Sequence, residues 1–304
     1  MSAYLFAHFT ETKNGDQEYI WYAISHDGLN WVDLGNDSPV LASRLGTKGV
    51  RDPFIVYDEK LEKYFIIATD LLTTSGNWYN FSHKGSRALV VWESKDLINW
   101  SEERLIEVGI KGAGCVWAPE AVFCKEEDAW FVFFASCVRE KGQLHHKQRI
   151  YGAFTKDFKE FTPTFKYIDA KTDIIDTNIV WNNGWYYRFS KDETNKKITI
   201  ERSKTLISYE WECIYSEVFA NFFGLEGPEC YYLDDMKKWC LIADQYHKHQ
   251  GYTPFLCDDL ASGKFVQLHN DQFEMGKRKK RHGGVIKITD EQAEKLIEHF
   301  GIDK

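Results

Sequence analysis

A short phrase recurs along the whole chain. Its clearest copies are SHDGLNW (residues 25–31), SKDLINW (94–100) and TKDFKEF (155–161), and weaker copies lie at 203–211 and 258–265. The aromatic residues that end the copies stand at positions 31, 100, 161, 211 and 265, so the intervals are 69, 61, 50 and 54 residues. A repeat of this length indicates an architecture built from similar units placed side by side.

A second phrase alternates with the first. Its five copies are RDPFIVY (51–57), WAPEAVF (117–123), IDTNIVW (175–181), EGPECYY (226–232) and RHGGVIK (281–287). A turn and an aromatic-rich run, such as KYFIIA, follow each of the first four copies. β-Branched and aromatic runs bounded by Asp, Asn, Gly and Lys indicate strands.

The two phrases together predict an all-β fold, a five-bladed β-propeller with four-stranded blades, because radial repetition protects the edges of the sheets. The fifth copy of the second phrase lacks strands after it, whereas residues 4–33 lack a copy before them. We therefore expect the N- and C-terminal strands to close the ring jointly. This closure leaves no linker, which predicts one domain over residues 1–304. A capping box at TDEQ (289–292) predicts a short C-terminal helix over 289–304.

Charge and composition exclude several classes of partner. The formal net charge of −8 argues against nucleic acid and against an anionic membrane surface. No apolar run is long enough to cross a bilayer. The basic run Lys277–Arg281 is interpreted as a solvated loop, because it stands in an acidic chain. The 16% aromatic content would suit an uncharged ligand with apolar faces, such as a sugar.

The cysteines and the N-terminus predict the compartment. Seven cysteines form an odd count with no zinc-binding spacing, which favours reduced thiols. The N-terminal residues lack a basic start and an apolar run that leads to a cleavage site. We therefore expect a cytoplasmic location.

The starts of the second phrase carry the candidate chemistry. The first strand of a propeller blade lines the central channel, so its leading residues face a pocket at one end. At these starts stand Asp52, the Trp117–Ala118 step, Asp176, Glu226 and His282. A turn alone does not require acidic residues at an equivalent place in three of five repeats. Repulsion and burial would raise the pKa of one carboxyl while another stays ionised, as glycoside cleavage requires.

The succession VRDP (50–53), WAPE (117–120), ID (175–176), EGP (226–228) and RHG (281–283) resembles glycoside hydrolase family 43. Members are five-bladed propellers that trim arabinose, xylose or galactose from plant glycans, and the resemblance covers nearly the entire chain. It implies an inverting reaction with Asp52 as general base and Glu226 as general acid. It also implies that Asp176 orients the acid and adjusts its pKa, and that Trp117 forms an aromatic wall of the terminal-sugar subsite.

The family often holds a calcium ion on the propeller axis near a histidine equivalent to His282. His282 is therefore a candidate substrate-binding residue and a candidate ligand of a structural calcium ion. One imidazole is a poor calcium site, so the remaining ligands would have to be oxygens or waters. No redox or nucleotide cofactor is expected.

Several other residues are candidates for the pocket. Arg188, inside an aromatic strand, could bind a sugar hydroxyl or pair with a carboxylate, and the two interpretations have equal weight. Residues 71–88 and 138–150 are expected to be longer loops that carry specificity. Trp78 and Tyr79 in the first loop, and His145 and His146 in the second, are either pocket residues or surface residues. His8 is interpreted as a structural histidine and Asp70 as a turn residue.

The preferred function is exo-acting release of a terminal pentose from short oligosaccharides. The resemblance alone ranks α-L-arabinofuranose first, β-D-xylose second and galactose third. One alternative is a non-catalytic sugar-binding propeller. Another is a phosphorylase, in which Arg51 or Arg188 would provide the anion site. The expected partner is thus a small oligosaccharide, and the sequence specifies no oligomeric state.

Overall fold

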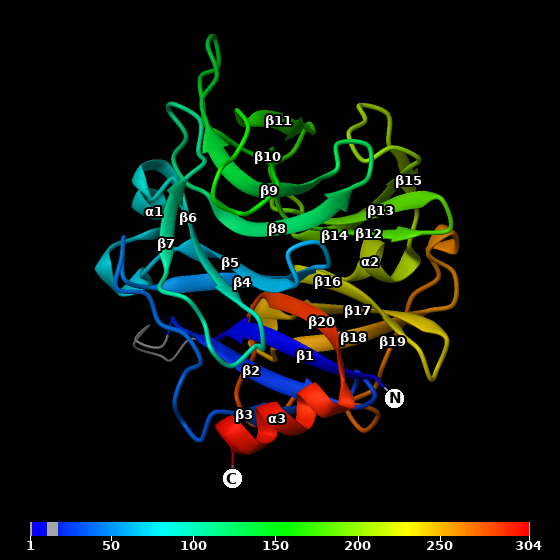
Figure 1. Cartoon of the computed structure of the whole chain (residues 1–304). Coiled ribbons are helices and arrows are strands. Elements are labelled where there is room, and N and C mark those ends of the chain that lie inside the picture. Colours follow the sequence, from blue (N-terminus) through cyan, green and yellow to red (C-terminus); the bar gives the residue numbers. More distant parts are fainter. Residues whose placement is uncertain (1, 11–17, 304) are drawn as a thin grey trace.

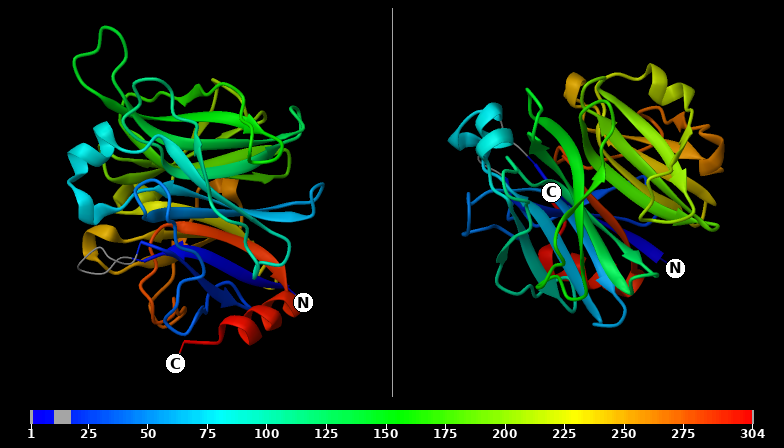
Figure 2. Two further views of the ribbon diagram at one scale, coloured as in Figure 1. Left: turned by 60° about the vertical axis from the view of Figure 1, so that its left-hand side comes forward. Right: turned by 90° about the horizontal axis from the view of Figure 1, so that it is seen from above.

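The computed structural model describes residues 2–10 and 18–303, and within these ranges the chain forms five four-stranded antiparallel sheets. The sheets are arranged as the blades of a propeller (Figures 1 and 2). This arrangement confirms the predicted fold class.

Four blades use consecutive strands, with the innermost strand first in blades I to IV. Blade I consists of β4 (Val50–Asp58), β5 (Lys63–Asp70), β6 (Ala88–Ser94) and β7 (Arg104–Glu107). Blade II consists of β8 (Trp117–Cys124), β9 (Ala129–Val138), β10 (Lys147–Thr155) and β11 (Phe165–Ile168). Blade III consists of β12 (Ile174–Asn182), β13 (Trp185–Asp192), β14 (Lys197–Ser203) and β15 (Glu212–Ile214). Blade IV consists of β16 (Glu226–Leu233), β17 (Lys238–Asp244), β18 (Tyr252–Cys257) and β19 (Val266–Gln267).

Blade V joins the two ends of the chain. Its strands are, in spatial order, β20 (Gly283–Thr289), β1 (Ser2–Phe9), β2 (Ile20–Ser25) and β3 (Val32–Leu34). The antiparallel pairing of β1 with β20 runs from Ser2 opposite Thr289 to His8 opposite Gly283, and Figure 1 shows the two strands side by side. The prediction that both termini close the ring is therefore confirmed.

The C-terminal helix α3 (Asp290–Phe300) packs on blade V (Figure 1). Thr289 accepts a hydrogen bond from the Gln292 amide, and the Gln292 side chain accepts one from the Thr289 amide, so the predicted capping box is present. The helix stops before residue 304. Gly301 adopts a φ of 74°, and Ile302 forms an isolated bridge with Leu34 instead.

The remaining helices are short. They are α1 (Trp78–Lys84), α2 (Glu217–Asn221) and the 3₁₀ turns η1 (Thr73–Ser75), η2 (Tyr246–Lys248) and η3 (Leu260–Ser262). In the described part of the chain, no helix has the length and apolar character needed to cross a membrane.

The first repeated phrase forms the turn that leads to the outermost strand of a blade. In blade V the Asp27 carboxylate accepts hydrogen bonds from the amides of Leu29 and Asn30, and Ser25 Oγ accepts one from Gly28. Equivalent bonds form around Asp96 in blade I and Asp157 in blade II. The spacing that recurs from blade to blade is thus explained by turn chemistry.

The hydrophobic core is divided among the five interfaces between blades. Each of five clusters of buried residues combines side chains from two neighbouring blades. Most of the large aromatic rings are used here, among them Phe131, Phe133 and Phe134 on β9. The expectation that the aromatic content reflects exposed sugar-stacking rings is therefore wrong for most of these residues, because packing one sheet on another requires bulky side chains.

Candidate active site

The innermost strands of blades I to IV each begin with a β-bulge. Their pairing shifts at the start of the second phrase, because one extra residue is inserted on the inner strand. A left-handed residue occurs in each bulge, with φ of 49° at Asp52, 46° at Ala118, 46° at Asp176 and 54° at Gly227. Bulges bend a strand and redirect a side chain, and they recur next to active sites.

The expectation that all three acidic residues hold equivalent positions is wrong by one residue in blade IV. Gly227 occupies the left-handed position there, and Glu226 precedes it. A Cβ atom on Gly227 would lie 2.7 Å from the Tyr252 hydroxyl and 2.8 Å from Cγ of His282. Glycine therefore makes room for His282, and the acidic group stands on the preceding residue.

These strand starts surround one cavity of about 400 Å³, a size typical of small-ligand sites. It brings together six of the predicted site residues: Asp52, Asp176, Glu226, Trp117, Trp78 and His282. The other residues that line it are Phe9, Arg51, Leu71, Ile175, Lys191, Glu193, Tyr246 and Arg281. Residues far apart in sequence thus meet because every blade contributes its inner strand.

Asp52 is held from two sides. Thr69 Oγ1 donates a hydrogen bond to Asp52 Oδ2 at 2.9 Å and accepts one from the Ala118 amide at 2.8 Å. The second oxygen, Oδ1, lies 3.7 Å from Nδ1 of His282. The carboxylate is fixed in orientation and still lines the cavity, which are the requirements for a group that takes a proton from water.

Asp176 is linked to the backbone beside Glu226. Its Oδ2 accepts a hydrogen bond from the Gly227 amide at 3.1 Å. Burial raises the pKa of Asp176 to about 6, and the charges of Glu226 and Asp52 act in the same direction. Near neutral pH this carboxyl is therefore protonated in part of the molecules.

Glu226 is enclosed by two cations. Its Oε2 accepts from Lys191 Nζ at 2.8 Å, and its Oε1 accepts from Arg281 Nη2 at 2.6 Å. Burial raises the pKa of Glu226, but these two ion pairs outweigh that effect and hold the pKa at about 2. In the structure without substrate Glu226 is therefore ionised, which differs from the expectation of a protonated acid.

Aromatic side chains form one wall of the cavity. The rings of Trp78 on α1 and Trp117 on β8 meet edge to face with centroids 6.1 Å apart. The Arg51 guanidinium lies 4.4 Å from the centroid of the Phe9 ring and 5.6 Å from that of Trp78. Trp78 is 59% exposed, so this wall also forms part of the rim. Such rings suit the apolar faces of a sugar.

A second polar layer is buried further along the inner strands. Asn178 Nδ2 donates to Glu120 Oε2 at 2.8 Å and to Glu229 Oε2 at 2.7 Å. Glu229 Oε1 accepts a bond from the Val285 amide at 2.7 Å. Burial raises the pKa of Glu120 to about 7, and it also raises that of Glu229. The layer is a hydrogen-bonded support, since burying these carboxyls without partners would be costly.

The surroundings of His282 do not fit the calcium site that the family resemblance implies. Its Nδ1 and Nε2 lie 3.7 Å from Asp52 and 3.7 Å from Glu120 respectively, so each nitrogen faces a different carboxylate. Within residues 2–10 and 18–303, no three His, Cys, Asp or Glu side chains are grouped to hold one metal ion. Calcium takes about six to eight oxygen ligands.

Arg188 lies outside the catalytic cavity. Its Nε donates to Glu201 Oε2 at 2.7 Å, and its guanidinium stacks on Trp211 with 4.1 Å between Cζ and the ring centroid. Arg188 was expected either to bind a sugar hydroxyl or to pair with a carboxylate, and its contact with Glu201 agrees with the second interpretation. The expected position in the catalytic pocket is wrong, because Arg188 and Lys191, three residues apart on β13, point to opposite faces of the strand.

His8 and Asp70 have the structural surroundings that the sequence favours. His8 is fully buried and contacts the carbonyl of Phe9 through Nδ1 at 3.0 Å. Asp70 accepts hydrogen bonds from the amide and the hydroxyl of Thr47 at 2.7 and 2.8 Å. Neither lines the catalytic cavity.

The first expected loop is more ordered than predicted, and the second is shorter. Residues 71–88 contain η1 and α1, and α1 brings Trp78 to the cavity. Of the second range, residue 138 ends β9 and residues 147–150 begin β10, so residues 139–146 form the loop, which projects beyond the blades (Figures 1 and 2). His146 contacts the ring of His83 with 4.6 Å between centroids, and neither His145 nor His146 lines the cavity.

The basic run is a loop, as expected, but only part of it is solvated. Arg281 pairs with Glu226 in the cavity, and buried Lys280 donates to Asp33 Oδ1 at 2.6 Å. Arg278 stacks on a tryptophan ring with 3.6 Å between Cζ and the centroid. Three of the five cations thus have a carboxylate or a ring as partner and Lys280 is buried, whereas Lys277 is exposed. A charge count along the sequence does not reveal such partners.

Residues 1–294 match the model of a family described as a probable glycosyl hydrolase domain, related to glycoside hydrolase family 43. The chain belongs to the family-43-related glycosyl hydrolases. The suspected family is thus confirmed over nearly the whole chain.

One relative of this glycosyl hydrolase domain has a name that specifies a sugar. An α-L-arabinofuranosidase from Bifidobacterium longum subsp. longum is 30% identical over 224 residues, which are 65% of this chain and 21% of that protein. The chain therefore spans about a fifth of that relative's length.

Solved structures share the fold. An endo-1,4-β-xylanase from Bacteroides thetaiotaomicron has a TM-score of 0.58 at 14% identity and covers 93% of each chain. An exo-β-1,3-galactanase from Phanerochaete chrysosporium has a TM-score of 0.52 at 18% identity, covering 71% of this chain and 49% of the other. At these identities the likeness concerns the architecture.

Several lining residues of the glycosyl hydrolase cavity are absent from the sequence-based candidates, and three of them stand at or just after the end of a second strand. Lys191 lies at the end of β13, and Glu193 comes directly after that strand. Tyr246 follows the end of β17. Their common signal is a polar or aromatic residue at the end of the strand that pairs with a bulged inner strand. Arg51 entered the candidates only as an anion site, and the structure pairs it with buried Glu18 at 2.6 Å.

Proposed function

We propose that this protein is an exo-acting, inverting glycoside hydrolase that releases a terminal pentose, with α-L-arabinofuranose as the preferred sugar. The observation that carries the proposal is the convergence of Asp52, Asp176 and Glu226, from three blades, on one cavity with an aromatic wall. Family membership supports hydrolysis of a glycosidic bond. The name of the relative that is 30% identical supports arabinofuranose over xylose and galactose.

The reaction is a single displacement. A water molecule attacks the anomeric carbon and gives its proton to Asp52, while the bond to the leaving oxygen breaks and Glu226 donates a proton to that oxygen. Water then needs space between base and sugar, so inverting enzymes hold the two carboxyls roughly 6.5–9.5 Å apart. Asp176 contributes by its hydrogen bond beside Glu226 and by its own negative charge.

Glu226 can act as the acid only when it carries a proton. Substrate binding would have to draw Lys191 or Arg281 from Glu226 onto a sugar oxygen and exclude water from the cavity. Burial, which already raises the pKa of Glu226, would then prevail over the remaining cation. Catalytic hydrogen bonds often reach their working geometry only in the substrate complex.

Hydrolysis is favoured over phosphorolysis by the state of the cations. Arg51 is paired with Glu18, Lys191 with Glu226 and Glu193, and Arg281 with Glu226 and Asp244. A phosphate ion would have to compete with these carboxylates for every cation that lines the cavity. Water needs no such site.

A panel assay tests the proposal directly. The protein is incubated with arabino-, xylo- and galacto-oligosaccharides, with and without phosphate, and the products are identified by chromatography. Free arabinose from chain ends, independent of phosphate and first seen by NMR in the inverted anomeric form, is expected. Internal fragments would contradict the exo mode, a retained anomer the single displacement, and a sugar phosphate the use of water.

A sugar-binding propeller without catalysis remains the alternative of another class. The aromatic wall would serve such a protein equally well, but three converging carboxylates would not be needed. Replacing Glu226 by Gln separates the two. Hydrolysis is expected to be lost in E226Q, whereas a binding protein would show no turnover before or after the substitution.

A further inference from the structure

A second groove of about 470 Å³ lies between blades II and III. It is on the other side of the strands that carry the catalytic cavity. Ile175 and its partner Lys191 line the catalytic cavity, whereas Ile174 and its partner Asp192 line the groove. Successive side chains of a strand point to opposite faces, so the two sites share β12 and β13 as a common wall.

The groove contains a buried donor without a partner. Arg188 is 6% exposed and lines the groove, and in the described part of the chain its Nη1 is buried and makes no hydrogen bond. The rest of the guanidinium is fixed by Glu201 and by the Trp211 ring. A buried unpaired N–H is costly, and a ligand oxygen placed in the groove would remove that cost.

Aromatic rings stand beside this donor. Tyr209 is 100% exposed, and Tyr167 and Trp211 form the wall near Arg188. The Tyr167 hydroxyl donates to the Leu206 carbonyl at 2.9 Å, and Trp211 Nε1 donates to the Ser208 carbonyl at 3.1 Å. These two rings are therefore held in place, which lowers the entropic cost of binding.

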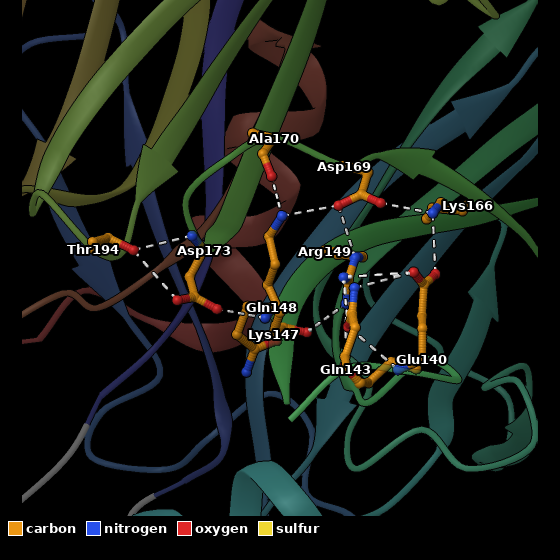
Figure 3. A network of polar contacts seen from close by, with 11 residues as sticks. Glu140, Gln143, Lys147, Gln148, Arg149, Lys166, Asp169, Ala170, Asp173 and Thr194 are labelled. Carbon is orange, nitrogen blue, oxygen red and sulfur yellow. Dashed lines mark hydrogen bonds and ion pairs between the residues drawn. The ribbon is translucent and has the colours of Figure 1, made fainter. Parts of the chain in front are cut away.

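The part of the groove formed by blade II is fixed by a network of ion pairs (Figure 3). Asp169 accepts from buried Arg149 Nε at 2.8 Å and from Lys166 Nζ at 2.6 Å, and Lys166 also donates to Glu140 at 3.0 Å. Both walls thus exist before any ligand arrives.

The charges of the groove select the kind of ligand. Two cations line it, Lys166 and Arg188, against three carboxylates, Asp169, Asp192 and Glu201, for a formal charge of −1. An anionic ligand is disfavoured by this balance, and an uncharged one with hydroxyl groups is not. Aromatic rings beside a donor and several acceptors match the apolar face and the hydroxyls of a sugar ring.

We propose that the groove between blades II and III is a second binding site for a neutral glycan chain, anchored by Arg188 and Tyr209. Only the choice of a plant pentose glycan as ligand rests on the proposed function. The site would hold a stretch of glycan while the neighbouring cavity processes a chain end.

Binding to the groove is measured apart from turnover. In an E226Q background, titration calorimetry uses a neutral arabino-oligosaccharide of six sugars, with a xylo-oligosaccharide and an oligogalacturonate of equal length for comparison. Two sites are expected for a neutral ligand. Y209A and R188M should each weaken one of them roughly tenfold and leave the other unchanged.

Tyr215→Ala is the matched control, because Tyr215 is 72% exposed and does not line the groove. It should bind as the parent does. Thermal melting of each variant checks the fold, and Tyr209, being fully exposed, can be removed without loss of packing. One site only, equal effects of Y209A and Y215A, or binding of the oligogalacturonate alone would overturn the proposal. If the protein hydrolyses nothing but two-site binding persists, the proposed function fails and this inference stands.

Discussion

The catalytic cavity and the groove between blades II and III share two strands, yet their charged groups come from different distances along the chain. The cavity receives residues from all five blades because it lies at the end of the channel. The groove receives residues only from β11 of blade II, from β12 to β15 of blade III and from adjoining segments. Three carboxylates from three blades can surround one sugar bond, whereas neighbouring strands provide a surface on which a sugar can rest. Position relative to the propeller axis would therefore separate the proposed chemistry from the proposed binding.

The largest expected effect is the loss of the proposed acid. In E226Q the side chain keeps its size but cannot donate a proton to the leaving oxygen, so kcat should fall roughly 10³-fold, within the range for general acid catalysis. Steady-state kinetics on a natural arabinoside measures this change. Glu201→Gln, which alters a carboxylate in the groove, is the matched control and should leave kcat unchanged. Equal losses in both variants would contradict the division between the two sites.

The next effect concerns stability. Asn178→Leu removes the donor shared by Glu120 and Glu229, and two buried carboxyls would lose a partner, which should lower the free energy of unfolding by about 3 kcal/mol. Denaturant unfolding measures it. Thr199→Val in the groove removes one hydrogen bond to the Ser190 carbonyl and should cost about 1 kcal/mol or less. Equal losses of unfolding free energy in the two variants would contradict the inference that Asn178 supports two buried carboxyls.

A pH profile tests the cation next to Glu226. Lys191 lowers the pKa of Glu226, so in K191M that pKa rises and the protonated acid persists to higher pH. The basic limb of kcat/KM should therefore move up by about one pH unit or more, since an opposite charge in contact shifts a pKa by roughly 1–3 units. R188M, on the opposite face of β13, should not move that limb. A downward shift in K191M would contradict the assignment of Glu226 as acid.

The smallest effect is expected from the groove. Y209A should raise KM for a long arabinan a few-fold, because one anchor of the chain is lost. Its kcat/KM for a short arabinoside should match that of the parent, since the catalytic cavity is untouched. Assays with both substrates compare the two values. A matching loss on the short substrate would mean that Tyr209 acts through the structure of blade III.

The sequence predicted the ring and its closure because each blade repeats a local pattern, and local patterns depend on turn and strand chemistry that neighbouring residues determine. It also predicted that Asp52, Asp176, Glu226 and Trp117 would share a cavity, since the inner strands of a propeller converge. For Trp78, which lies on α1, it left the pocket and the surface open.

The misplaced candidates have a common cause in strand register. Arg188 was a candidate for the pocket, but Lys191 faces Glu226, because the two residues, three apart on β13, point to opposite faces of the strand. A shift of one residue moves every side chain to the other face, and hydrophobic pattern alone does not locate the bulge.

What the sequence by itself determined is the number of blades, the joint closure and the acidic character of the channel, all of which follow from repetition. Only the tertiary structure decided which cations neutralise Glu226, where Arg188 points and which partners Lys280 and Arg281 find. Pairing between residues as distant as Glu226 and Arg281 depends on the complete ring, and no local pattern encodes such a contact.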